Sequence, residues 1–288
     1  MEAVKHFERA GAPLAWRHWA GQEGAPALVM LHGLASNGTR WREFAEATVA
    51  RTGWHVIAPD LRGHGGSARR GRLHIRHWLE DLEALLDHAG FERAVIGGHC
   101  LGANVALHFA RAYPRRTQGL VLVEPMLPDA LRGPLGVMRR LRWLLTALSV
   151  PVRLLNALGI YRRRLPPLDL TELDARTRAA MAEHGSFEAM RKRYSAPRMD
   201  MFHMPVASYL QALSQLLRPL GGLDRLRLPV LTLLSSGGVF ADTQQTQHML
   251  QSLPEHRMEV FDALHWIPTE QPQAMIDTIG RWLSEQWS

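Results

Sequence analysis

The stretch Gly98-His99-Cys100-Leu101-Gly102 lies between a short apolar run and an amphipathic segment, and it decides the fold that this sequence predicts. The apolar run Ala94–Ile96 is typical of a buried strand, whereas Leu101–Tyr113 has apolar residues at helical spacing. The two flanking glycines indicate a turn so tight that side chains would collide there. We therefore expect Cys100 at a sharp strand–turn–helix junction, in strained backbone geometry at the N-terminus of a helix.

The same alternation of strands and helices extends on both sides of this junction. Short apolar runs indicate strands that are buried on both faces, and segments with helical spacing separate them. This pattern predicts an α/β fold with a mostly parallel central sheet and helices on both faces. Residues 3–19 are expected to add one or two antiparallel edge strands. The other expected strands are Ala27–Leu31, Trp54–Ala58, Leu120–Val123, Pro229–Leu234 and Arg257–Phe261, and the other expected helices are Trp41–Arg51, Ile75–Ala89, Thr243–Leu253 and Pro272–Trp287.

The alternation is interrupted by residues 125–228, which show helical patterns without a convincing strand. We expect a helical cap inserted between two strands, with an α/β core formed by residues 1–124 and 229–288. Ligands of such sheets bind beyond the carboxyl ends of the strands, where a cap would cover them. The apolar stretch Trp143–Tyr161 has Pro151 and Arg153 in its middle. It therefore predicts a buried amphipathic pair of cap helices, and no stable membrane insertion is expected.

Composition excludes several classes of protein. The chain has 288 residues, of which 46% are hydrophobic and 21% charged, which excludes disorder. Its single cysteine excludes an intrachain disulfide framework and a Cys-rich zinc site. Since the N-terminus shows no apolar leader, the expected location is cytoplasmic. Neither a phosphate-binding nor a dinucleotide-binding glycine motif is present, so no cofactor is expected, and no metal.

The basic excess of the chain lies in the expected cap. Residues 125–228 contain 17 basic and 8 acidic residues, whereas the rest contains 17 and 19, for a net charge of +7 overall. Only two of the basic residues are lysines and no nucleic-acid motif accompanies the arginines, so a solvated surface is expected and nucleic acid is not an expected partner. The cap has two interpretations: ordinary packing with a solvated basic face, or an apolar acyl pocket with a basic mouth suited to acyl-CoA or an anionic lipid surface.

Four motifs stand in an order that resembles the α/β-hydrolase superfamily, in its cap-bearing, esterase-like branch. The resemblance covers the expected core. The motifs are Leu31-His32-Gly33-Leu34, Asp60-Leu61-Arg62-Gly63-His64-Gly65-Gly66-Ser67, Gly98-His99-Cys100-Leu101-Gly102, and Ala263-Leu264-His265-Trp266 followed by Glu270-Gln271-Pro272. In the family the first is an oxyanion loop, the second shapes the floor of the site, the third carries the nucleophile and the fourth carries the catalytic histidine.

The resemblance implies a role for each matching residue. Cys100 stands where most of the family has serine, although dienelactone hydrolases and polyhydroxyalkanoate synthases also have G-x-C-x-G. His265 would be the general base. The backbone N–H groups of Leu34 and Leu101 would form the oxyanion hole. The expected site loops contribute His32, Gly33, Gly98, Gly102 and Trp266, and the family uses His32 and His99 structurally.

These residues predict a hydrolase that cleaves a carboxylic ester or thioester through a covalent acyl-enzyme on Cys100. A thiolate paired with histidine is a strong nucleophile, and its thioester intermediate is well suited to passing the acyl group to an alcohol or amine. An acyltransferase is therefore the first alternative, and a non-catalytic ligand-binding protein on a hydrolase scaffold is the second. The expected partner is a small-molecule acyl ester or thioester, and a homodimer is the expected form if the chain self-associates.

Two carboxylates compete for the acidic position of the triad. The family usually places it in a loop after the strand Pro229–Leu234, but that position is Gly238 here. Asp242 follows four residues later, where its spacing to Gln245 is also typical of a helix N-cap. Glu124, directly after the strand Leu120–Val123, is the position to which some relatives move the acid, and it is favoured. Asp262 is less favoured because the strand pattern points it away from the site.

Overall fold

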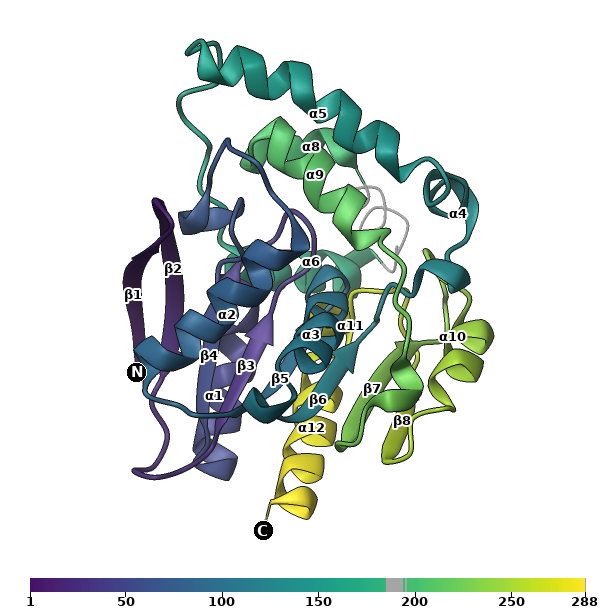
Figure 1. Ribbon diagram of the computed structural model, residues 1–288. Helices are drawn as coiled ribbons and strands as arrows, with labels where there is room; N and C mark the ends of the chain where they lie inside the picture. Colours follow the sequence, from purple (N-terminus) through teal and green to yellow (C-terminus); the bar gives the residue numbers. More distant parts are fainter. Residues whose placement is uncertain (185–193, 195, 288) are drawn as a thin grey trace.

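The computed structural model describes residues 1–184, 194 and 196–287 (Figure 1). Its sheet has eight strands in the order β1-β2-β4-β3-β5-β6-β7-β8. The pairs β1–β2 and β2–β4 are antiparallel, and the pairs from β4 through β3 to β8 are parallel. The mostly parallel sheet and the antiparallel edge are therefore confirmed. The strands are β1 Glu2–Arg9, β2 Ala12–Trp19, β3 Ala27–Leu31, β4 His55–Pro59, β5 Ala94–His99, β6 Thr117–Val123, β7 Val230–Ser235 and β8 His256–Phe261.

Helices cover both faces of this sheet. The α-helices outside residues 125–228 are α1 Arg42–Thr52, α2 Ile75–Ala89, α3 Leu101–Ala112, α10 Thr243–Leu250, α11 Ile267–Glu270 and α12 Pro272–Gln286, and the 3-10 helices there are η1 Gly38–Trp41, η2 Gly65–Ser67 and η3 Pro114–Arg116. Alternate residues of β3 pack into two separate apolar clusters. Val29 and Leu31 join α2 and α3 on one face, whereas Leu28 and Met30 join α1 and α12 on the other. Successive side chains of a strand point to opposite faces of the sheet. Because helices cover both faces, β3 is apolar at every position.

The segment between β6 and β7, residues 125–228, is called the insertion. In its described part it contains the helices η4 Pro128–Ala130, α4 Gly133–Met138, α5 Arg142–Ala157, α6 Leu170–His184, α8 Pro197–His203, α9 Val206–Leu216 and η5 Leu223–Arg225. These helices gather beyond one end of the sheet (Figure 1). No strand of the described insertion joins the sheet; an isolated bridge pairs Leu131 with Ala241.

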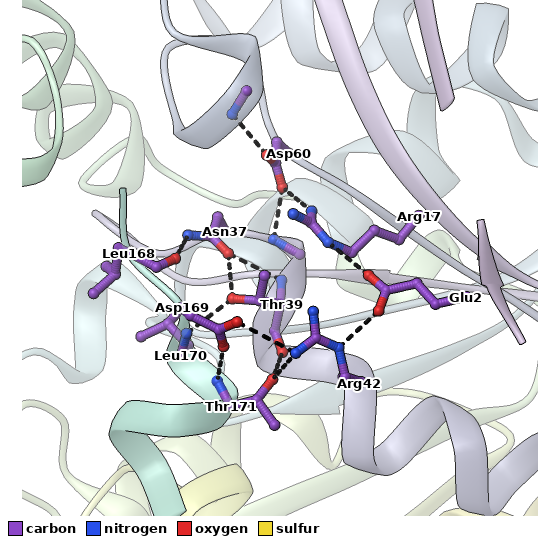
Figure 2. Close-up of polar contacts among 12 residues, drawn as sticks. Glu2, Arg17, Asn37, Thr39, Arg42, Asp60, Leu168, Asp169, Leu170 and Thr171 are labelled. Carbon is purple, nitrogen blue, oxygen red and sulfur yellow. Dashed lines mark hydrogen bonds and ion pairs between the residues drawn. The ribbon is translucent and has the colours of Figure 1, made fainter. Parts of the chain in front are cut away.

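A polar network joins the insertion to the loop that follows β3 (Figure 2). Asn37 Nδ2 donates to Leu168 O over 2.7 Å, and Leu170 N–H donates to Thr39 Oγ1 over 2.9 Å. Thr171 Oγ1 donates to Thr39 O over 2.8 Å. Since these bonds link residues more than a hundred positions apart, they fix the start of α6 against the core.

Asp60 of the second sequence motif also stabilises the loop after β3. Its Oδ1 accepts from Gly38 N–H at 2.7 Å and from Arg17 Nη1 at 2.8 Å, and its Oδ2 accepts from Gly66 N–H at 2.8 Å (Figure 2). Asp60 is buried, and a buried carboxylate needs such partners. Asp60 therefore links its own loop to the loop after β3 and to strand β2.

One expectation about the insertion was wrong. The stretch Trp143–Tyr161 was expected to form a buried amphipathic pair of helices, but the single helix α5 runs through Pro151 and exposes most of its apolar side chains. Sequence periodicity shows that such a helix has two faces, but it cannot tell which face the rest of the protein covers. Within the described residues, no helix combines the length and the apolar character needed to cross a membrane.

Candidate active site

Cys100 lies between the end of β5 and the start of α3, in a backbone conformation that non-glycine residues rarely adopt. Its φ is 54° and its ψ is −113°. A Cβ atom built on Gly98 would lie 2.5 Å from the carbonyl carbon of Gly102, and one built on Gly102 would lie 2.3 Å from Leu31 O. The two glycines are therefore required by close backbone approaches, as the motif predicts. Cys100 is 9% exposed and lines the main cavity of the described residues.

His265 lies in the loop between β8 and α11, and its ring is oriented by Glu124. His265 Nδ1 donates to Glu124 Oε2 over 2.9 Å, and both side chains are buried. Glu124 follows β6 directly and has a positive φ of 50°. Its other oxygen, Oε1, accepts from the backbone N–H of Ser235, at the end of the neighbouring strand β7. Since Nδ1 is used by Glu124, the opposite ring nitrogen, Nε2, is available to Cys100.

The electrostatic environment favours the charged form of His265. Burial alone would lower the pKa of this imidazole, but the hydrogen bonds and negative charges of Cys100 and Glu124 outweigh burial and raise its pKa from 6.5 to about 10. These interactions favour the imidazolium form of His265, which lies between the carboxylate of Glu124 and the side chain of Cys100. A positive charge at this place can stabilise a negative charge on the neighbouring sulfur.

Glu270 holds the loop that carries His265, a role that the sequence analysis did not assign. Its carboxylate accepts from the backbone N–H groups of Leu264 at 2.8 Å, His265 at 3.2 Å and Trp266 at 2.8 Å. Three donors on one carboxylate leave the loop little freedom. A glutamate a few residues after the histidine in the fourth motif is the signal that could have found it. The Phe240 ring also packs edge-on against the His265 ring, with 4.8 Å between their centroids.

The structure does not bring Asp242 to His265. Asp242 is the N-cap of α10, where Oδ1 accepts from Gln245 N–H over 2.8 Å and Oδ2 pairs with Arg132 of the insertion. Gly238, at the usual acidic position, has a φ of 51°, so a side chain there would strain the backbone. Asp262 is exposed and lies 3.5 Å from Ser236 Oγ.

Two further histidines at the site are buried and form hydrogen bonds with backbone groups. Burial lowers the pKa of His32 to about 4, so its ring is neutral; Nε2 accepts from Leu61 N–H at 2.9 Å and Nδ1 donates to Gly33 O at 2.8 Å. Burial also lowers the pKa of His99 well below 6.5, and its Nε2 donates to His265 O over 3.0 Å. Both therefore fix the backbone of loops at the site.

The first motif and the elbow place backbone N–H groups near Cys100. Gly33 and Leu34 lie in the loop after β3 and line the same cavity as Cys100. A Cβ built on Gly33 would lie 3.4 Å from Cys100 Cβ, so this loop approaches the cysteine closely. Leu101 is the first residue of α3, where an N–H has no intrahelical partner.

The cavity beside Cys100 has a volume of about 700 Å³ and is lined by both the core and the insertion. Its walls are largely apolar and include Trp266. Two polar groups that the sequence analysis missed also face it. Asp200 of α8 has its pKa raised to about 7 by burial, although a hydrogen bond from Tyr209 opposes the shift. Tyr194 donates to Asp174 over 2.7 Å, and Asp174 also pairs with Arg40.

Metal ligands were not expected, and the described residues contain no group of three or more His, Cys, Asp or Glu side chains that could hold a metal ion. The reactive groups that the described site brings together are the side chains of Cys100, His265 and Glu124.

The chain belongs to the family described as alpha/beta hydrolase fold, whose model matches residues 26–272. Solved structures agree with this assignment. A hydrolase from Pseudomonas aeruginosa superposes with a TM-score of 0.70 at 20% identity, covering 99% of this chain and 98% of the other. The thioesterase domain from the curacin biosynthetic pathway superposes with a TM-score of 0.63 at 19% identity, covering 97% and 99%. At these identities the likeness concerns the fold alone.

Curated relatives match mostly over part of their length. Epoxide hydrolase A of Mycobacterium tuberculosis is 37% identical over 42% of this chain and 38% of its own length. The mouse sn-1-specific diacylglycerol lipase is 34% identical over 39% and 36%. The chain thus spans less than two fifths of these two relatives. The magnesium-chelatase 30 kDa subunit of Rhodobacter capsulatus is 27% identical over 96% of this chain and 93% of that protein.

Proposed function

We propose that this protein hydrolyses a carboxylic ester or thioester through a covalent acyl-enzyme on Cys100. The observation that carries the proposal is the arrangement around His265: Nδ1 donates to Glu124 over 2.9 Å, and the ring lines the same cavity as Cys100, whose side chain raises the pKa of the imidazole. Nucleophile, base and orienting carboxylate come from three separate loops at the carboxyl ends of the parallel strands. This is the relation that nucleophilic catalysis requires.

The reaction would proceed in two steps. The Cys100 thiolate, stabilised by the positive charge of His265, attacks the carbonyl carbon and forms a tetrahedral intermediate. The N–H groups of Leu34 and Leu101 bind its oxyanion. The intermediate collapses, the bond to the leaving alkoxide or thiolate breaks, and His265 protonates that group. Water then attacks the thioester while His265 accepts its proton, which releases the carboxylic acid and restores Cys100.

Glu124 would orient His265 in this mechanism, and Asp242 would not take part. Glu124 is buried and its two oxygens are used by His265 and by Ser235 N–H, so it is rigidly placed. Asp242 is already bonded to the N-terminus of α10 and to Arg132. The insertion would act as a cap, because its residues supply one wall of the cavity beside Cys100, and the apolar walls fit an acyl chain better than a small polar acid.

The proposal is tested by trapping the intermediate. We expect the protein to hydrolyse short p-nitrophenyl esters and, on rapid quenching, to show one acyl adduct that maps to Cys100 by mass spectrometry. Cys100→Ala should lose the adduct and reduce turnover by at least about a thousandfold, since the remaining site only binds and polarises the carbonyl. Cys100 should also be the residue that iodoacetamide labels. An active, unlabelled Cys100→Ala protein would refute the nucleophile.

The same assay separates the two alternatives. If an added alcohol or amine captures the acyl group faster than water does, the protein is an acyltransferase that uses the same site. One relative that matches over nearly its whole length is named as a magnesium-chelatase subunit, so a ligand-binding role is also tested. A wild-type chain with neither turnover nor labelling of Cys100 would favour that binding role.

A further inference from the structure

Exposed apolar side chains are concentrated on one part of the insertion. In the described residues, 11 of the 17 exposed large hydrophobic side chains lie between residues 137 and 161. Trp143 is 62% exposed, Leu148 58% and Leu154 62%. Soluble proteins rarely leave so many apolar groups together in water, and such patches mark surfaces that bind a protein or a membrane.

These side chains occupy one continuous face of α5. At 3.6 residues per turn, the exposed positions from Trp143 to Leu158 fall within an arc of about 200° around the helix axis, and Thr146 at the edge of this arc is the polar residue among them. Nine apolar positions fill about 160° of this arc without a polar residue among them, and we call them the outer face of α5: Trp143, Leu144, Ala147, Leu148, Val150, Pro151, Leu154, Leu155 and Leu158. The opposite side, which includes the buried Leu145 and Ser149, packs on α9, and Thr146 Oγ1 lies 2.9 Å from Ser214 Oγ. The usual pattern of a surface helix, polar outside and apolar inside, is therefore reversed.

Positive charge surrounds this apolar face. Residues 130–168 contain eight arginines and no acidic residue. Arg140 lies just before α5, and Arg163 and Arg164 follow it; all three are exposed. Aromatic side chains stand near both ends, with Trp143 in the first turn of α5 and Tyr161 beyond its last turn. An apolar stripe with arginines and aromatic rings at its ends is the pattern of a helix that lies in the headgroup region of a bilayer.

We propose that the outer face of α5 docks flat on an anionic lipid bilayer. Figure 1 shows α5 at the outside of the insertion, beyond α8 and α9, where nothing in the described residues covers it. The apolar side chains would enter the acyl boundary, and the arginines would contact lipid phosphates, each adding electrostatic attraction. The proposal does not depend on the reaction at Cys100.

The charge of the segment argues against a second copy of the chain as the occupant. Two α5 helices that face each other would bring the arginines of both copies together, and residues 130–168 offer no carboxylate to compensate them. A bilayer with anionic headgroups supplies both the apolar phase and the negative charge that this surface lacks.

The orientation would place the substrate cavity next to the lipid. Leu135 and Met138 of α4 and Met199 of α8 line the cavity, while Val137 and Met199 are also exposed at the outside. A chain docked through α5 would therefore hold these cavity walls close to the membrane surface, where apolar esters partition.

Co-sedimentation of the full-length protein with vesicles tests the proposal. We expect binding to equimolar phosphatidylcholine and phosphatidylglycerol, weaker binding to phosphatidylcholine alone, and loss of the difference at high salt. The double variant Leu148→Gln/Leu154→Gln should lower the partition coefficient by at least about tenfold, because it removes apolar groups that enter the bilayer. Arg163→Gln/Arg164→Gln should weaken binding to the anionic vesicles and leave binding to neutral vesicles unchanged.

Matched controls distinguish vesicle binding through the outer face of α5 from nonspecific adsorption through other exposed apolar residues and from the proposed reaction at Cys100. Val4→Gln/Val260→Gln changes two exposed apolar residues of β1 and β8 and should bind like the wild type. Cys100→Ala should also bind normally, which keeps the result apart from the proposed reaction. Brominated lipids should quench tryptophan fluorescence in the wild type but much less in Trp143→Phe. If no vesicle binds, or if Leu148→Gln/Leu154→Gln instead abolishes a dimer seen by light scattering, the proposal is wrong.

Discussion

The core helix α2 and the insertion helix α5 differ in where their apolar faces lie, against the sheet in α2 and toward the outside in α5. In α2 the apolar residues Trp78, Leu82 and Leu85 are buried against the sheet, whereas in α5 Leu148 and Leu154 face outward. The two helices are of similar length and both are strongly amphipathic. The difference teaches that amphipathic periodicity reports the existence of two faces, while the partner of the apolar face depends on what the fold brings near it.

The two candidate carboxylates also differ in whether their partner lies in the core or in the insertion. Glu124 is fixed inside the core and bonds His265, whereas Asp242 bonds Arg132 of the insertion. We expect Glu124→Gln to lower the acylation rate by about 100-fold or more, because the imidazolium loses its counter-charge and its orientation. Asp242→Asn should keep nearly full activity, because an asparagine also caps a helix. Pre-steady-state release of p-nitrophenol measures both rates.

The reverse outcome would contradict this assignment. An inactive Asp242→Asn with an active Glu124→Gln would mean that the loop after β7 moves to deliver Asp242 to His265. If both variants keep their activity, Cys100 and His265 act as a dyad and the core carboxylate has a structural role only.

Truncation of one leucine in each region tests the comparison of apolar faces. Leu85 of α2 is 1% exposed and Leu148 of α5 is 58% exposed. Leu85→Ala should lower the free energy of unfolding by about 2–5 kcal/mol, because it leaves a cavity in a packed core. Leu148→Ala should change it by less than about 0.5 kcal/mol. Urea unfolding measures both; a large loss with Leu148→Ala would show that α5 is covered in solution.

The raised pKa of His265 predicts that the free energy of unfolding depends on pH through this core residue. The folded pKa of about 10 exceeds the ordinary value of 6.5, so the stability due to the charged imidazole is fully present below pH 6.5. It is lost as the pH rises toward about 10. The difference in unfolding free energy between wild type and Glu124→Gln should therefore shrink from pH 6 to pH 10. A constant difference would show that Glu124 does not hold the proton on His265.

Much of the core could be predicted because its signals are local. The strand before Cys100, the two glycines of the tight turn and the following helix are consecutive residues. The close approach that requires Gly102 is to Leu31, which belongs to a different sequence motif. The helix over Ile75–Ala89 was predicted with the bounds that the structure has. Glu270 was missed as a functional residue because its position a few residues after His265 indicates that it lies near the histidine loop, but not that its carboxylate accepts hydrogen bonds from the backbone of that loop.

The sequence by itself determined the alternating elements, the sharp turn at Cys100 and the histidine loop, because each depends on neighbours along the chain. Only the tertiary structure decided that Glu124 lies at His265 while Asp242 does not, because 141 residues separate the first pair and side-chain geometry is set by strand order. It also decided that the apolar face of α5 points outward. Both results depend on which surfaces meet after the chain has folded, and that information is distributed over the whole molecule.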